Sequence, residues 1–184
     1  MQFVTWRLAD ALPQGLLKEW MEERAIWLGL HPSPWSEETE REYRRHFSQR
    51  MEQWLDAGHG ACILGQAEFS EIVEKTLRHF DGVKFDLIAY VIMPNHIHLI
   101  VKPTKEKNLS KLVQGWKSWS AREINRRLGQ EGTVWQEEYW DRLVRDEAHL
   151  ERCIRYIANN PAKAGLREGQ YRLFVPENGA PAPL

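Results

Sequence analysis

Short apolar runs mark three strands along the chain. Residues 2–8 are rich in β-branched and aromatic side chains and predict the first strand. Residues 85–93 and 96–103 predict two more strands. Because only a Pro-Asn pair separates these two, they are expected to form a hairpin.

Amphipathic stretches between the first strand and the hairpin predict three helices. The first covers residues 16–28, the second opens at Ser36, and the third covers residues 68–80. Glutamates follow Ser36 and suit the positive end of a helix dipole. The mixed charge of the first two helices indicates an exposed helical arm, inserted at residues 14–57. The third helix is expected to supply the core with Ile72, Leu77 and Phe80.

Two further helices are expected after the hairpin. Asp146 can cap the last one, which runs to Asn160 and is expected to stop at Pro161. The aromatic-rich segment 134–145 before it predicts a turn and a short strand. The other helix, residues 108–128, carries an apolar stripe made of Leu109, Leu112, Val113, Trp116 and Trp119.

This order of elements predicts an α+β fold, in which an antiparallel sheet is covered by helices in a ferredoxin-like arrangement. The 184 residues suffice for one domain with a substantial core. We expect that domain to span residues 1–167. Residues 168–184 are expected to form a C-terminal tail, whose Pro/Ala-rich end should be mobile.

The composition excludes several classes of protein. With 42% hydrophobic and 28% charged residues, the chain is typical of a folded globular protein and not of a disordered one. No apolar stretch approaches the roughly 18 residues of a membrane span, and the first residues lack a secretory signal pattern. We therefore expect no membrane partner and a cytoplasmic location. Cys62 and Cys153 are isolated from each other and are expected to be reduced packing residues.

The net charge of −1 hides an uneven distribution. Residues 102–167 hold fourteen Lys or Arg against nine Asp or Glu, and the remainder holds eleven against seventeen. These balances, +5 and −6, fit a protein that faces a polyanion with one surface. Alternatively, the excess of positive charge belongs to helix faces that are simply solvated.

His96 and His98 are the first residues that indicate chemistry. Side chains alternate across a strand, so both imidazoles should lie on one face. Two neutral imidazoles at this spacing can chelate a divalent metal. Two half-exposed histidines bonded to backbone or carboxylates would give the same pattern. A histidine-triad hydrolase is excluded because residue 100 is Ile.

Tyr156 and Asn160 lie four residues apart on the last predicted helix, on one face. A ligand that meets one of these side chains can therefore meet the other. A phenol becomes a useful nucleophile only where nearby cations favour its phenolate. The alternative is that Tyr156 packs its ring and binds water.

Three motifs occur in a fixed order between residues 82 and 166. They read Pro94-Asn95-His96-Ile97-His98, then Trp135-Gln136, then Tyr156-Ile157-x-x-Asn160-Pro161-x-Lys163-Ala164-Gly165-Leu166. In this order the chain resembles the REP-associated tyrosine transposases. These belong to the single-tyrosine HUH endonucleases and are relatives of small insertion-sequence transposases.

The resemblance implies a role for each matching residue. His96 and His98 would hold Mg²⁺ or Mn²⁺, Tyr156 would be the nucleophile, and Asn160 would be a third metal ligand, where relatives often carry Gln. The substrate would be single-stranded DNA beside a folded hairpin, at repeated extragenic palindromes. The product of attack would be a 5′-phosphotyrosine, and the protein could act as a monomer or a homodimer.

Basic and aromatic side chains are further candidates for DNA contact. The basic ones are Lys102, Lys105, Lys111, Lys117, Arg122, Arg126, Arg152 and Arg155. Of the tryptophans, Trp135 and Trp140 could stack bases, whereas Trp116 and Trp119 are expected in the core.

Two hypotheses of function follow. The first is a metal-dependent single-stranded DNA endonuclease and strand transferase. The second is a domesticated, non-catalytic binder of structured DNA repeats, which a site too open to hold metal would favour. An unrelated metal hydrolase is a remote third reading.

Overall fold

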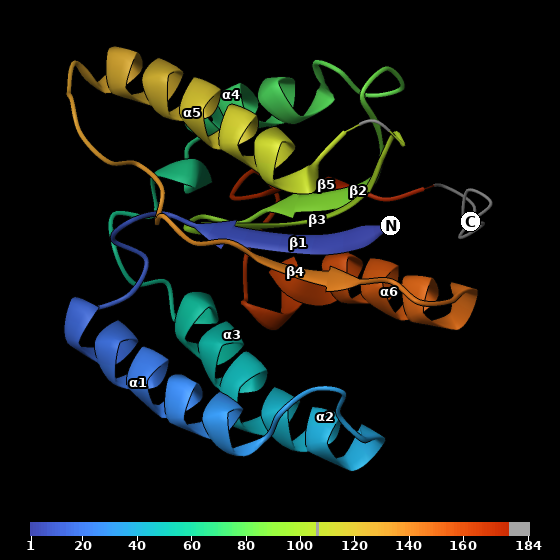
Figure 1. Ribbon diagram of the computed structural model, residues 1–184. Coiled ribbons are helices and arrows are strands. Elements are labelled where there is room, and N and C mark those ends of the chain that lie inside the picture. Colours follow the sequence, from blue (N-terminus) through green and yellow to red (C-terminus); the bar gives the residue numbers. More distant parts are fainter. Residues whose placement is uncertain (106, 177–184) are drawn as a thin grey trace.

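A five-stranded antiparallel sheet forms the centre of the computed structural model, which describes residues 1–105 and 107–176 (Figure 1). Its strands lie in the order β4-β1-β3-β2-β5. The bounds are Gln2–Arg7 for β1, Phe85–Ile92 for β2, His96–Pro103 for β3, Trp140–Leu143 for β4 and Arg172–Phe174 for β5. Every pair of neighbouring strands in this sheet is antiparallel. Strands β2 and β3 form the predicted hairpin.

Helices cover both faces of the sheet. Helices α4 (Ala67–Arg78) and α5 (Leu109–Leu128) lie on one face, and α6 (Glu147–Lys163) lies on the other (Figure 1). Helix α4 connects β1 to β2 and α5 connects β3 to β4, so the first four strands have the ferredoxin-like order 4-1-3-2. The predicted α+β, ferredoxin-like fold is confirmed. No helix within residues 1–105 and 107–176 is long and apolar enough to cross a membrane.

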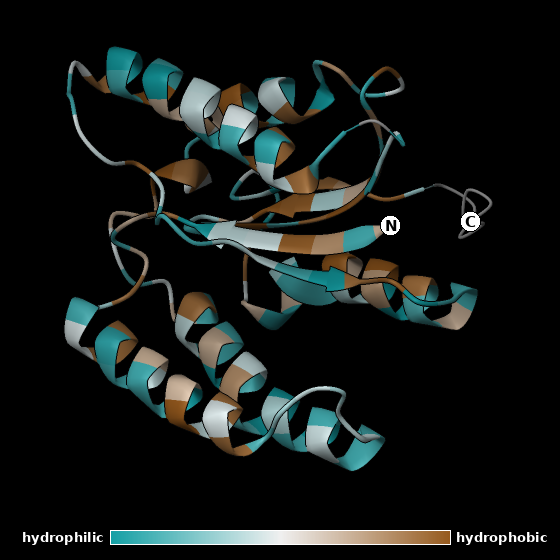
Figure 2. Cartoon of the chain, in the orientation of Figure 1, coloured by the Kyte–Doolittle hydropathy of each residue, from teal (hydrophilic) through white to brown (hydrophobic). Residues whose placement is uncertain are grey.

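The helical arm lies beside α6, on the same side of the sheet (Figure 1). It consists of α1 (Gln14–Leu30), α2 (Glu37–Tyr43), the π-helical turn η1 (Arg44–Ser48) and α3 (Gln49–Asp56). The Ser36 hydroxyl accepts a hydrogen bond from the Thr39 backbone N–H at 3.2 Å, which explains why α2 begins where the sequence predicts. Helix α2 has no buried residue and is hydrophilic almost throughout (Figure 2).

Alternation along β3 divides the core in two. Ile97, Leu99 and Val101 belong to the hydrophobic cluster beneath α4 and α5, where Trp6 stacks on Trp116. Ile100 belongs to the second cluster, beneath α6. His96 and His98 share the side of Ile100, so both face α6 and the arm. This face is called the site face below.

Several predicted features differ in the structure. Helix α4 ends at Arg78, and Phe80 is exposed beneath the Lys84 ammonium. Trp119 is also exposed, because it sits about 60° from Trp116 around α5, at the edge of the apolar stripe. Helix α6 does not stop at Pro161 but continues to Lys163, since a proline in the last turn removes only one intrahelical hydrogen bond.

The C-terminal region also departs from the prediction. Residues expected to belong to a tail form β5, which pairs with β2 from Tyr90 to Ile92, so the sheet extends beyond residue 167. Ion pairs from Arg172 to Glu71 and Glu74 attach this strand to α4. The predicted mobile end, residues 177–184, lies outside the described residues. Before α4, the chain forms the 3-10 turn η2 (Ile63–Gly65).

Candidate active site

The β2–β3 hairpin places His96 and His98 side by side on the site face. Both are buried, and their ring centroids lie 4.7 Å apart. Arg7 lies opposite His96 and Thr5 lies opposite His98 in the β1–β3 register. The alternation predicted from the sequence is therefore confirmed.

Hydrogen bonds to both Nδ1 atoms orient the two imidazoles. His98 Nδ1 bonds the Thr5 hydroxyl at 2.7 Å, and His96 Nδ1 bonds Asn95 Oδ1 at 2.8 Å. The Asn95 amide nitrogen donates to the carbonyls of Leu55 and His59, so its oxygen must face His96. An amide oxygen only accepts, which means that His96 carries its proton on Nδ1 and leaves Nε2 free to bind a metal.

Burial keeps both imidazoles neutral. It lowers the pKa of His96 to about 3, assisted by the positive charges of Lys163 and Arg7. It also lowers the pKa of His98 well below its ordinary value, assisted by His96 and Lys163. Neutral imidazoles are the form that binds metal ions.

Helix α6 brings Tyr156 to the histidine pair. Its hydroxyl lies 3.4 Å from His98 Nε2, and the two rings meet edge to face with centroids 5.2 Å apart. Phe3 packs against both rings, at 5.5 Å from His98 and 5.8 Å from Tyr156. Burial and the nearby Glu52 carboxylate raise the pKa of Tyr156 far above its ordinary value, so the free protein holds a neutral phenol.

Asn160 follows Tyr156 by one helical turn and is almost fully buried. Neither its Oδ1 nor its Nδ2 makes a hydrogen bond of good geometry among the described residues, although the amide interacts with the Tyr156 hydroxyl and opposes the rise in the pKa of that group. A buried amide without good hydrogen bonds costs free energy, which a bound ligand would recover. No cluster of three or more His, Cys, Asp and Glu suited to a metal occurs in the described chain, and it is the family resemblance that implies this amide as a third ligand beside the two imidazoles. The donor set thus fits a divalent cation.

The arm adds two carboxylates that the sequence did not indicate. Lys163, near the end of α6, pairs with Asp56 at 2.8 Å and lies 3.9 Å from Glu52. Burial raises the pKa of Glu52, although Lys163 and the Tyr156 hydroxyl oppose this shift. Glu52 carried no sequence signal, because its contact with Tyr156 depends on how the arm folds back over the sheet.

The predicted DNA-binding residues fall into three groups, on α5, at the end of β3 and on α6. Lys111, Lys117, Arg122 and Arg126 lie on α5, across the sheet from the histidines. Of these, Lys117 donates to the carbonyls of Gln136 and Glu137, and Arg126 pairs with Glu123. Lys102 is the last residue but one of β3, and Lys105 follows the strand. Arg152 and Arg155 are exposed on α6, within one helical turn of Tyr156. The structure therefore separates the α5 group from the histidines and places the α6 pair within one helical turn of Tyr156. Of the stacking candidates, Trp135 is buried and Trp140 is half-buried on β4.

Comparisons with known proteins agree with the family resemblance that the histidine and tyrosine motifs indicate. The family model described as "Transposase IS200 like" matches residues 63–160, which is 98 of the 184 residues. A curated Haemophilus influenzae protein, assigned by name to the REP-associated tyrosine transposases, is 30% identical over 111 residues. That match covers 55% of this chain and 61% of the relative's length.

Two solved structures are similar to this chain at TM-scores below 0.5. One is a REP-associated tyrosine transposase bound to a REP hairpin, at 17% identity and a TM-score of 0.48, covering 91% of this chain and 69% of that one. The other is a Deinococcus radiodurans protein described as a transposase, at 14% identity and a TM-score of 0.45, covering 86% and 88%. The resemblance predicted from the motifs is confirmed by the family model. Through that match over more than half of its length, the chain belongs to the IS200-like transposase family.

Proposed function

We propose that this protein is a metal-dependent single-stranded DNA endonuclease and strand transferase that forms a 5′-phosphotyrosine at Tyr156. The observation that carries the proposal is the 3.4 Å approach of the Tyr156 hydroxyl to His98 Nε2 on a face that also holds His96. The name of the Haemophilus relative supports hairpin-forming repeated palindromes as the substrate.

His96, His98 and Asn160 would hold Mg²⁺ or Mn²⁺. When bound, the ion supplies a Lewis acid that offsets the charge developing on the scissile phosphate. The two Nδ1 hydrogen bonds keep the imidazoles oriented for this role. The free protein is therefore prepared for the cation, and binding need not reorganise the histidines.

The Tyr156 oxygen would attack the phosphorus in line with the 3′-oxygen of the preceding nucleotide. The Tyr O–P bond forms, the P–O3′ bond breaks, and the departing 3′-oxygen takes up a proton from water to leave as a hydroxyl. The phenol must lose its proton, and Glu52, whose carboxylate interacts with the Tyr156 hydroxyl, would accept it. Attack by another 3′-hydroxyl on the phosphotyrosine reverses these steps and joins two strands without a nucleotide cofactor.

A labelled hairpin with single-stranded flanks, incubated with the protein and Mn²⁺, tests the proposal. We expect an adduct that survives denaturant with the native protein and with the control Tyr171→Phe. Tyr156→Phe should form no adduct. Cleavage by a folded Tyr156→Phe variant at the native rate would overturn the proposed nucleophile.

The alternative of a non-catalytic binder receives less support. A site too open to hold a metal would favour it, whereas His96 and His98 are buried and oriented. Native protein that binds hairpins but never cleaves them, with either Mg²⁺ or Mn²⁺, would favour this alternative.

A further inference from the structure

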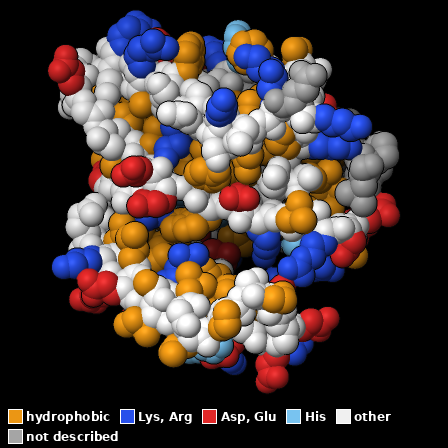
Figure 3. Space-filling model, in the orientation of Figure 1, with side chains coloured by type: hydrophobic (Ala, Val, Ile, Leu, Met, Phe, Trp, Pro, Cys, Tyr) orange, Lys and Arg blue, Asp and Glu red, His pale blue; other side chains and the backbone are white. Residues whose placement is uncertain are grey.

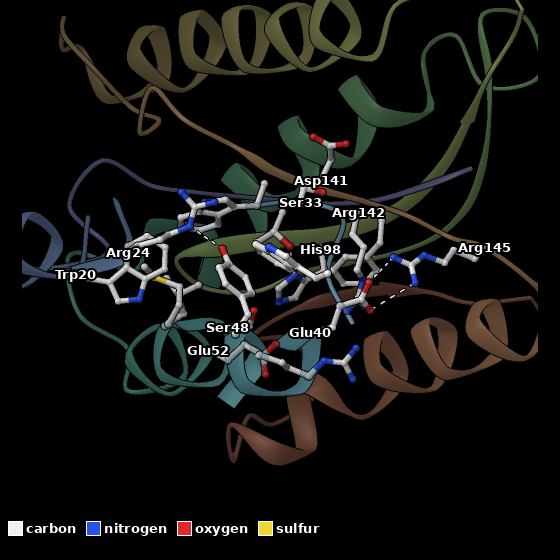
Figure 4. A pocket seen from close by; sticks show the side chains of 18 of the residues that line it. Trp20, Arg24, Ser33, Glu40, Ser48, Glu52, His98, Asp141, Arg142 and Arg145 are labelled. Atoms are coloured by element: carbon white, nitrogen blue, oxygen red, sulfur yellow. Dashed lines mark hydrogen bonds and ion pairs between the residues drawn. The ribbon is translucent and has the colours of Figure 1, made fainter. Parts of the chain in front are cut away.

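A cavity of about 600 Å³ separates the arm from the site face (Figure 4). Thr5 and His98 line it from the sheet, so the cavity begins at the candidate active site. The space-filling view shows a hollow between the arm and the body, with hydrophobic side chains around it and basic side chains at its right-hand end (Figure 3). A volume in this range, about 300–1,000 Å³, is typical of small-molecule sites.

Aromatic rings make up much of the wall. They are Phe3, Trp20, Trp35, Tyr43 and Trp140. Trp35 and Tyr43 lie 4.9 Å apart in the arm, and Trp20 meets Trp140 of β4 edge to face at 5.9 Å. Flat rings on two sides of one cavity suit a planar ligand, and nucleobases stack on such rings whatever their sequence.

Of the four arginines that line the cavity, only Arg145 forms an ion pair among the described residues; Arg24, Arg44 and Arg142 form none. Arg24 bonds the Tyr43 hydroxyl, and Arg145 pairs with Glu40 (Figure 4). Arg142 forms no ion pair within the described part of the chain, although its charge acts on the Glu52 carboxylate, and its side chain donates to the Cys153 sulfur at 3.7 Å. A thiol is a weak acceptor, so the guanidinium keeps its capacity to bind an anion.

Arg142 lies close to the reacting groups. Its guanidinium is 5.6 Å from the centre of the Phe3 ring, which packs on both His98 and Tyr156. Only the Phe3 side chain would thus separate a phosphate bound to Arg142 from His98 and Tyr156. The acidic residues do not oppose this: Lys163 lies near Glu52, and the Asp141 carboxylate points away from the cavity in Figure 4.

A local irregularity of the arm contributes to the same cavity. Helix α2 passes into α3 through the π-helical turn η1, which supplies Arg44 and Ser48 to the lining. Such π-helical turns are rare and frequently occur at functional sites. The irregular turn of the arm therefore lies where the arm lines the cavity.

We propose that this cavity binds one unpaired nucleotide of the DNA strand, adjacent to the scissile phosphate. Its base stacks between the rings of the arm and β4, and Arg142 contacts its phosphate. This inference rests on the proposed function, and it assigns the arm to reading the single-stranded flank.

Binding without cleavage tests the cavity separately from catalysis. Tyr156→Phe protein in EDTA is titrated into a fluorescent hairpin, and each flank nucleotide in turn is replaced by an abasic one. We expect one position to lose roughly tenfold or more in affinity, because base stacking is lost there. Arg142→Gln should weaken binding of intact DNA and reduce its salt dependence. The matched control is Arg127→Gln on α5, across the sheet, which should leave the abasic profile unchanged.

The outcomes separate the two proposals. Tight hairpin binding with a flat abasic profile would overturn the cavity and leave the proposed function standing. A sensitive position without any adduct from native protein would support the cavity and contradict the catalytic proposal, and no DNA binding would contradict both. Crosslinking of 5-iodouridine at the sensitive position to the native chain needs no variant: crosslinks in the arm or β4 support the cavity, and crosslinks confined to α5 overturn it.

Discussion

Asn95 Oδ1 lies 2.8 Å from His96 Nδ1 and fixes which nitrogen of that imidazole carries the proton. The amide nitrogen of Asn95 is held by the carbonyls of Leu55 and His59, at the end of the arm. The arm and the candidate metal site are therefore connected through one side chain.

Removal of this amide should weaken metal binding. Asn95→Ala frees His96 to carry its proton on Nε2, so we expect a loss of about 10- to 100-fold in Mn²⁺ affinity, measured by calorimetry. The control is Asn159→Ala. Asn159 is exposed and adjoins the site residue Asn160 only in the sequence. Native Mn²⁺ affinity in a folded Asn95→Ala protein would show that Asn95 has no positioning role.

Asn160 should show opposite effects on stability and on metal binding. Replacement by Leu removes a buried amide that makes no hydrogen bond of good geometry among the described residues, so the metal-free variant should gain about 1 kcal/mol in free energy of unfolding. Mn²⁺ should stabilise the native protein more than Asn160→Leu. Denaturant titrations with and without Mn²⁺ measure both effects. Equal stabilisation of the two proteins by Mn²⁺ would exclude Asn160 as a ligand.

The metal-free protein should lose stability in acid. The ordinary imidazole pKa is 6.5, whereas burial lowers that of His96 to about 3 and also lowers that of His98. The unfolded chain therefore binds more protons below pH 6.5, and folding weakens as the pH falls toward the folded values. Each histidine contributes a slope of up to about 1.4 kcal/mol per pH unit.

Urea denaturation between pH 7 and pH 4 measures this dependence. His96→Gln with His98→Gln should flatten the profile, because neither position can then take a proton. An equally steep profile in the double variant would assign the acid sensitivity to other groups.

Glu52→Gln should slow formation of the adduct. The variant cannot accept the Tyr156 proton, and a lost general base costs about 10²- to 10⁴-fold in rate. The substitution also removes a negative charge that raises the pKa of Tyr156, so the variant should recover part of its rate as the pH rises. Single-turnover rates across pH test this, with the exposed Glu151→Gln on α6 as control. A native rate in Glu52→Gln would remove Glu52 from the mechanism.

The histidine pair and the tyrosine could be predicted from the sequence because local periodicity fixes their relations. Two residues on a strand face one way, and two residues four apart on a helix share a side. Tyr156 and His98 are 58 positions apart, and they meet because α6 packs on the sheet. Only the resemblance to a known family predicted this meeting from the sequence.

Other parts of the site left no local signal. Glu52 and Arg142 reach the site only because the arm folds under the sheet and β4 pairs with β1. The basic residues of α5 illustrate the converse: composition indicated a cationic face, but only packing could show that α5 lies on the opposite face from His98. Phe80 and Trp119 were misplaced because periodicity does not show where a helix ends or how wide its buried stripe is.

Mass spectrometry of the trapped protein–DNA adduct tests the central claim most directly. After nuclease and protease digestion, we expect a nucleotide-sized mass on the peptide that contains Tyr156, attached through its 5′-phosphate. The same mass on another tyrosine, or an unmodified Tyr156 peptide in material that carries covalent DNA, would contradict the account.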